Sequence, residues 1–252
     1  MRRLDTLAVG VATALLIFPV AGTATAAETV ESLVKKVDAK LYYPQTEGLR
    51  TLQADVQSSL SEVAMVQYPV GEMKFYWSQP YQARFALTGV AEGARDAESE
   101  LSPFAHWFVP MPLELIVKPY TANLTESETS YLIDLKTTDP AASVWAMTYT
   151  ISKETLLPTR WNLSTDQADL NMTIKLERLP SGKYLPVAIA GSPVGMEDVE
   201  VAFKVTHKKV GTWTLGESMT LSVAGGEWFI LRLMNHKVNQ PIPPGTFPEA
   251  QR

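Results

Sequence analysis

The chain has 252 residues, with 22 basic and 27 acidic side chains and a formal net charge of −5. A mildly acidic chain without a basic run has no electrostatic footprint for a phosphate backbone, so nucleic acid is not an expected partner. Because the chain contains no cysteine, a small scaffold held by disulfides is excluded, and the fold must depend on packing and hydrogen bonds.

The first 27 residues have the pattern of a cleaved signal peptide. Arg2 and Arg3 precede an apolar run from Leu7 to Val20, and the small residues 24–26 then form an A-x-A cleavage site. The run is shorter than the ~20 apolar residues that a membrane span needs. We therefore expect cleavage before Ala27 or Glu28 and export to the periplasm, with secretion as the alternative. The mature chain is expected to form one domain over residues 28–240.

Residues 29–43 are expected to form an amphipathic helix that ends at Pro44. Charged residues occupy one side, and the apolar positions follow the helical spacing i, i+3, i+4, i+7 and i+11. The apolar residues are Val30, Leu33, Val34, Val37 and Leu41. Such a helix needs an apolar surface on which to lie.

From residue 49 onward the apolar period changes to two, which predicts strands. Residues 71–78 and 81–88 flank Gln79-Pro80 and predict a hairpin. Later strands are expected around 145–151, 161–163, 170–176, 199–205, 215–223 and 228–238. The fold class is therefore mainly β with one helix (α+β), as a strongly curved antiparallel sheet or incomplete β-barrel wrapped around the N-terminal helix. The proline-rich tail 241–252 is expected to be extended.

The segment 89–123 has no clear period. An acidic stretch is followed by SPFAHWFVPMP, in which Phe104, Trp107 and Phe108 supply apolar mass. Loops of this length are often functional, so the three aromatic residues are candidates for a lid over a binding site. They could equally plug one end of the core, and the sequence leaves both readings open.

No catalytic or metal-binding pattern is present. The three histidines have no metal-ligand spacing, and the chain contains no nucleophile elbow, Walker loop or dinucleotide fingerprint. We therefore expect no catalytic residue, no metal site and no cofactor.

Aromatic side chains alternate onto one face of several predicted strands. A curved sheet whose inner face exceeds what one helix covers leaves a cavity that suits apolar ligands, although a filled core would explain the same residues. The candidate ligand-binding residues are Phe75, Trp77, Phe85, Trp145 and Trp161.

The order of signal peptide, helix from Glu28, strand in GLRTLQADVQSS and hairpin in MKFYWSQPYQARFAL resembles the periplasmic lipoprotein-carrier superfamily (LolA/LolB-like). The stretch ISKETLLPTRWNL is similar to a later strand-turn-strand of that superfamily, whereas the segment 89–123 replaces its usual D-G-x-x-x-W-x-Y strand. The resemblance implies an incomplete barrel whose cavity receives acyl chains. The expected function is a non-enzymatic carrier or sensor of a lipid or lipoprotein, with an envelope protein as a further partner. The alternative is a structural or protein-binding envelope domain with a filled core.

Overall fold

The computed structural model describes residues 28–60, 72–88, 98, 101–137, 139, 144–165 and 168–247. The expected signal peptide lies outside these residues. The helical elements are α1 (Val30–Lys40), η1 (Pro44–Glu47), η3 (Ser102–Phe104), α3 (Ala105–Phe108) and α4 (Leu113–Val117). The strands are β1 (Thr51–Leu60), β2 (Glu72–Ser78), β3 (Gln82–Thr88), β4 (Thr121–Glu126), β5 (Ser130–Lys136), β6 (Val144–Ser152), β7 (Pro158–Thr165), β8 (Asp169–Arg178), β9 (Tyr184–Pro193), β10 (Val201–Val210), β11 (Trp213–Val223) and β12 (Gly226–Val238). Among the described residues, no helix is long and apolar enough to cross a membrane.

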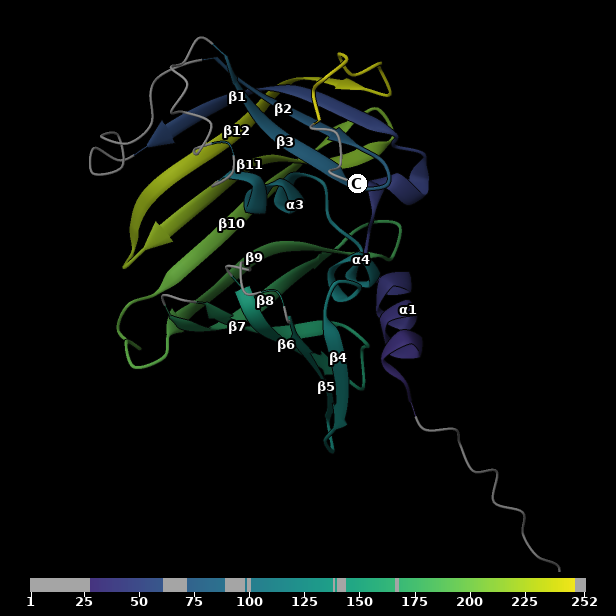
Figure 1. The fold of residues 1–252 in the computed structure, drawn as a ribbon, viewed down its shortest axis with the longest axis vertical. Helices are drawn as coiled ribbons and strands as arrows, with labels where there is room; N and C mark the ends of the chain where they lie inside the picture. The colour runs from purple at the N-terminus through teal and green to yellow at the C-terminus, as the bar shows by residue number, and fades with distance from the viewer. Residues whose placement is uncertain are drawn as a thin grey trace, which may run out of the picture.

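One antiparallel sheet contains all of these strands, in the order β3-β2-β1-β12-β11-β10-β9-β8-β7-β6-β5-β4. Neighbours in the sheet are neighbours in the chain, except that β1 pairs with β12. The sheet curls so that β1–β3 and β4–β7 lie at opposite ends of an open curve (Figure 1). The expected curved antiparallel sheet is therefore confirmed.

Along most of these strands, residues that face the interior alternate with residues that face solvent, as the apolar period of two in the sequence predicts. In β8, the apolar Leu170, Met172 and Ile174 face inward, while Asn171 and Thr173 between them are exposed. The predicted hairpin 71–88 is present as β2 and β3, with Phe75 opposite Phe85. The prediction did not identify β4, β5 and β9.

Helix α1 covers only one end of the inner face. The Thr29 hydroxyl accepts a hydrogen bond from the Ser32 N–H and caps the helix start, and Leu41 ends it in an extended conformation. Leu33, Val34 and Val37 are buried in a cluster with residues of β5 and β6 such as Ile133. The sheet therefore does not wrap around this helix alone.

The segment 101–109 covers the other end of the inner face. Trp107 and Phe108 pack into a second cluster with residues of β2 and β3, and with Leu215 and Met219 of β11. Gly216 permits this close approach, because a Cβ atom there would lie 2.6 Å from Phe108 Cα and 2.8 Å from the Trp107 carbonyl oxygen. The inner face thus carries two apolar clusters with a different cover on each (Figure 1).

Candidate functional site

Helix α1 and the segment 101–109 are the two covers of the inner face, and a cavity of about 470 Å³ lies where they meet. Its volume falls within the range of ~300–1,000 Å³ that is usual for small-molecule sites. Its walls come from the end of α1, the segment 106–120 and strands β6 to β9. The lining residues are Leu41, Tyr42, Tyr43, His106, Trp107, Pro110, Met111, Leu113, Leu115, Ile116, Pro119, Tyr120, Met147, Tyr149, Pro158, Trp161, Ile174, Pro186 and Ile189.

Two tyrosines after α1 hold the cavity wall through their hydroxyl groups. The Tyr42 hydroxyl accepts a hydrogen bond of 2.9 Å from the Thr214 N–H, which ties the end of α1 to β11. The Tyr43 hydroxyl donates to Asp38 Oδ1 at 2.6 Å. Burial and the negative charge of Asp38 raise the pKa of Tyr43, so its hydroxyl stays protonated and uncharged.

Asp38 also positions helix α4 over the cavity. Its Oδ1 accepts a hydrogen bond of 2.9 Å from the Leu113 N–H, and its Oδ2 accepts one of 3.1 Å from the Glu114 N–H. These backbone groups have no acceptor within a helix that begins at Leu113. One carboxylate of α1 therefore fixes both Tyr43 and the start of α4.

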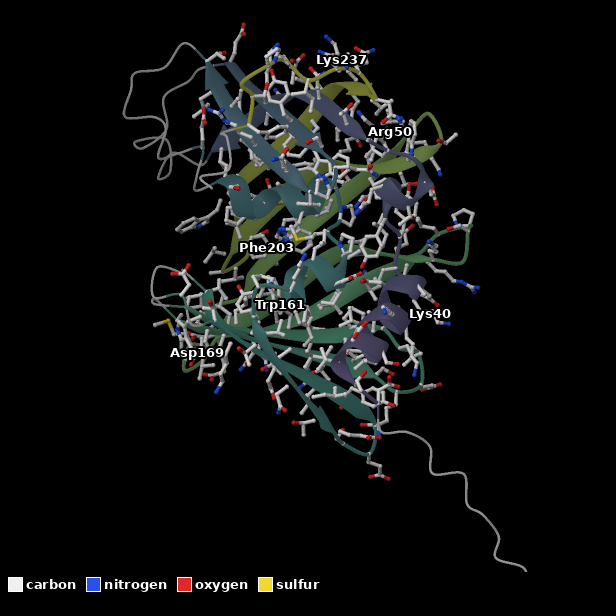
Figure 2. All side chains as sticks on the ribbon, turned by 45° about the vertical axis from the view of Figure 1, so that its right-hand side comes forward. Lys40, Arg50, Trp161, Asp169, Phe203 and Lys237 are labelled. Carbon is white, nitrogen blue, oxygen red and sulfur yellow. The ribbon has the colours of Figure 1, made fainter. Side chains whose placement is uncertain are left out.

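Trp161 of β7 forms a central part of the cavity wall. Its ring stacks on Tyr149 of β6, with ring centroids 6.1 Å apart and planes at 15°. Trp161 packs against both apolar clusters, and it lies near the centre of the molecule in Figure 2. Its buried Nε1 has no hydrogen-bond partner among the described residues. Burial also raises the pKa of Tyr149, which keeps this part of the wall uncharged.

The aromatic segment forms a wall of the cavity and also a packed core. Trp107 lines the cavity and stacks on Phe203 of β10, at 5.9 Å and 10°. Phe108 is fully buried against Phe75 and Phe85, at centroid distances of 5.7 Å and 6.1 Å. Only part of this segment therefore faces the cavity.

The structure brings two of the eight expected site residues, Trp161 and Trp107, into the cavity wall. It places Phe75, Trp77 and Phe85 in the fully buried core beneath α3, together with Phe108 of α3 itself, and all four lie outside that wall. Phe104 packs against Phe203 and Phe229 at 6.1 Å and 5.2 Å.

Trp145 lies outside the cavity because of a β-bulge. The expected strand face groups it with Met147, but the pairing of β6 with β7 shifts between Val144 and Ala146. An extra residue in one strand reverses the alternation on its far side. Trp145 is therefore 47% exposed, while Val144 packs inward.

Sequence reasoning did not identify most of the cavity wall. Met111, Leu115, Ile116, Pro119 and Tyr120 lie in the segment without a period, so no strand or helix face could be assigned to them. The run of apolar and proline residues from 108 to 120 was the available signal. This run indicated an apolar surface, but it did not show which of its side chains face the cavity.

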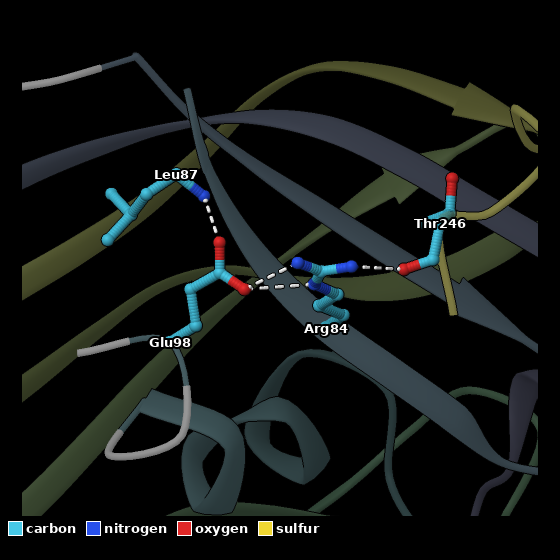
Figure 3. Close-up of polar contacts among 4 residues, drawn as sticks. All are labelled: Arg84, Leu87, Glu98 and Thr246. Atoms are coloured by element: carbon cyan, nitrogen blue, oxygen red, sulfur yellow. Dashed lines mark hydrogen bonds and ion pairs between the residues drawn. The ribbon is translucent and has the colours of Figure 1, made fainter. Parts of the chain in front are cut away.

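An ion pair joins Glu98 to Arg84 of the edge strand β3, and Arg84 also binds the tail. Arg84 Nη2 lies 2.7 Å from Glu98 Oε2, and Arg84 Nη1 donates to the Thr246 carbonyl oxygen at 2.7 Å (Figure 3). Glu98 Oε1 accepts the Leu87 N–H at 2.8 Å, on the outer edge of β3. A charge-assisted network with several partners is stronger than a single exposed ion pair.

No group of three or more His, Cys, Asp or Glu residues that could hold a metal ion occurs in the described part of the chain. Burial lowers the pKa of His106 in the cavity wall to about 4, so its ring is neutral at pH 7. The cavity therefore offers apolar surface and uncharged polar groups.

No family model and no curated protein sequence matches the chain. Among solved structures, it is similar to an outer membrane lipoprotein-sorting protein domain from Vibrio parahaemolyticus, with 10% identity and a TM-score of 0.38 over 84% of this chain and 93% of that one. A DUF1329 family protein from Desulfovibrio piger shows 9% identity and a TM-score of 0.41 over 88% and 98%. A LolA superfamily protein from Nitrosomonas europaea shows 8% identity and a TM-score of 0.34 over 86% and 96%. The curled antiparallel sheet has the incomplete, strongly curved form that the sequence analysis predicts.

Proposed function

We propose that the protein is a non-enzymatic periplasmic carrier or sensor that binds the acyl part of a lipid or lipoprotein in the cavity. The observation that supports this proposal is the cavity of about 470 Å³ with a largely apolar, uncharged wall. Each methylene that moves from water into such a wall contributes ~0.8 kcal/mol. A chain of several methylenes can therefore bind without a charged contact.

The signal-peptide pattern of the sequence supports the proposed location in the periplasm, where lipids and lipoproteins pass between membranes. Carriage or sensing needs reversible binding, and an uncharged wall provides this because the acyl chain forms no strong ionic contact that would slow its release.

A filled structural or protein-binding envelope domain is the second candidate function. The observation that favours it is the packed cluster between α3 and the sheet, where Phe75, Trp77, Phe85 and Phe108 have no exposed surface. This cluster has no room for a ligand. The two candidate functions therefore differ in whether the cavity of about 470 Å³ binds one.

The test measures displacement of the uncharged fluorescent probe N-phenyl-1-naphthylamine by acyl compounds, together with mass spectrometry of organic extracts of the purified mature protein. Trp161→Arg should weaken probe binding by tenfold or more, because a guanidinium in the cavity must be desolvated or fill the ligand's space. Trp145→Arg is the matched control, since that tryptophan is exposed and outside the wall, and it should bind as the wild type does. Wild-type protein without saturable probe binding and without extracted lipid would favour the structural alternative.

A further inference from the structure

A second cavity of about 370 Å³ lies between β3, α3 and the C-terminal segment. Its lining residues are Tyr81, Gln82, Ala83, Ser102, Ala105, His106, Met111 and Phe247. His106 and Met111 also line the first cavity, so the two spaces meet at these side chains.

The second cavity has a more polar wall than the first. The Tyr81 hydroxyl donates to the Val109 carbonyl oxygen at 2.6 Å, and its oxygen can still accept a hydrogen bond. Gln82 Oε1 accepts from the Ser78 hydroxyl at 3.3 Å, and within the described chain its amide nitrogen has no partner. The Ser102 hydroxyl also has no partner among the residues that the structure describes. These groups offer donors and acceptors to a small polar ligand.

His106 stands at the junction of the two spaces. Neither of its ring nitrogens has a hydrogen-bond partner in the described part of the chain, and its ring lies 5.2 Å from that of Trp107. A neutral imidazole presents one donor and one acceptor. Burial lowers the pKa of His106 to about 4, so this neutral form holds at pH 7.

We propose that the second cavity is a subsite for the uncharged polar part of an amphiphile whose acyl chain occupies the first cavity, with His106 binding the ester group between them. This proposal rests on the proposed function and specifies its ligand as a glycerol-type acyl ester. Among the residues that the structure describes, no charged side chain lines either cavity. Arg84, on the same strand as Ala83, is paired with Glu98 and Thr246. A carboxylate or phosphate buried here would therefore lack a counter-charge, which is costly, whereas ester and hydroxyl groups find partners.

The test compares 1-decanoylglycerol, decane and decanoate as competitors of N-phenyl-1-naphthylamine on the mature protein at pH 7. The wild type should bind 1-decanoylglycerol more tightly than decane and decanoate. His106→Phe keeps a ring at the junction but removes its hydrogen bonds, so it should reduce the preference for the glyceride over decane about fivefold, as expected for one uncharged hydrogen bond. Ser102→Trp should reduce the same preference by filling the second cavity from an exposed position.

Lys175→Trp is the matched control, because it adds the same side chain to the exposed face of β8, outside both cavities. It should leave the preference unchanged, and urea denaturation should confirm that each variant is folded. If decane and the glyceride bind equally and neither cavity variant alters their ratio, the subsite is refuted while the acyl cavity stands. If the glyceride and decane both fail to displace the probe, the subsite and the proposed function fail together. Tighter binding of decanoate than of the glyceride would also overturn the proposal, since it would require a cation at the junction.

Discussion

Replacement of Gly216 by alanine should separate the aromatic segment from the sheet. The new Cβ atom would lie 2.6 Å from Phe108 Cα and 2.8 Å from the Trp107 carbonyl oxygen, whereas ordinary contacts begin at 3.4 Å. Because both neighbours belong to the backbone, no rotamer change relieves the clash, and α3 must move by about 0.8 Å, the difference between 2.6 Å and 3.4 Å. Overpacking of this kind typically costs ~1–3 kcal/mol.

The matched control for Gly216→Ala is Gly226→Ala. The nearest atom to a Cβ at Gly226 is the Val223 carbonyl oxygen at 3.6 Å, which is an ordinary contact. Urea denaturation followed by tryptophan fluorescence should show a lower free energy of unfolding for Gly216→Ala and a change within ~1 kcal/mol for Gly226→Ala. Probe binding should also weaken in Gly216→Ala, because Trp107 is part of the cavity wall. Equal stability and equal probe affinity of the two variants would refute the close packing of α3 on β11.

The free energy of unfolding should fall between pH 7 and pH 5.5. Burial lowers the pKa of His106 and of His207 to about 4, while an unfolded histidine titrates near ~6.5, so the unfolded chain takes up protons first as the pH falls. Urea midpoints that stay constant or rise over this interval would contradict the buried, neutral state of these rings. Leu33→Asp should destabilise by several kcal/mol, because Leu33 has no exposed surface, whereas Ala39→Asp on the exposed face of α1 should change stability by less than ~1 kcal/mol in the same assay. Similar midpoints for these two variants would show that the Leu33 side of the helix does not face the core.

The sheet and its first helix could be predicted from the sequence because each depends on a local apolar period. Residues 170–176 show period two in the sequence and in their burial, and residues 30–37 show the helical spacing and the buried face. The helix ends at Lys40 rather than at residue 43, because Leu41 turns to an extended conformation before Pro44. Such boundaries depend on local backbone geometry rather than on period.

The site could be predicted only in part, because its position depends on contacts between segments that are distant in the sequence. The register of β6 with β7 shifts between Val144 and Ala146, and this shift turns the Trp145 side chain to the outer face. The alternation of apolar and polar residues in the sequence does not reveal the shift. Phe75 and Phe85 were expected to line a cavity, but the backbone of α3 packs onto β11 at Gly216 and fills the space beside them. The sequence therefore does not show which segment of the chain packs on which part of the sheet.

The pairing of β9 with β10 is short, extending only from Val201 opposite Gly191 to Lys204 opposite Ala188. One apolar cluster crosses this pairing, because Met172 of β8 and Ile189 of β9 belong to the same buried cluster as Val205 of β10 and Met219 of β11. A rotation of β9 against β10 would therefore separate buried side chains of this cluster. Packing of buried side chains, rather than a long ladder of hydrogen bonds, therefore fixes the curvature of the sheet between β9 and β10, and with it the distance between α1 and α3.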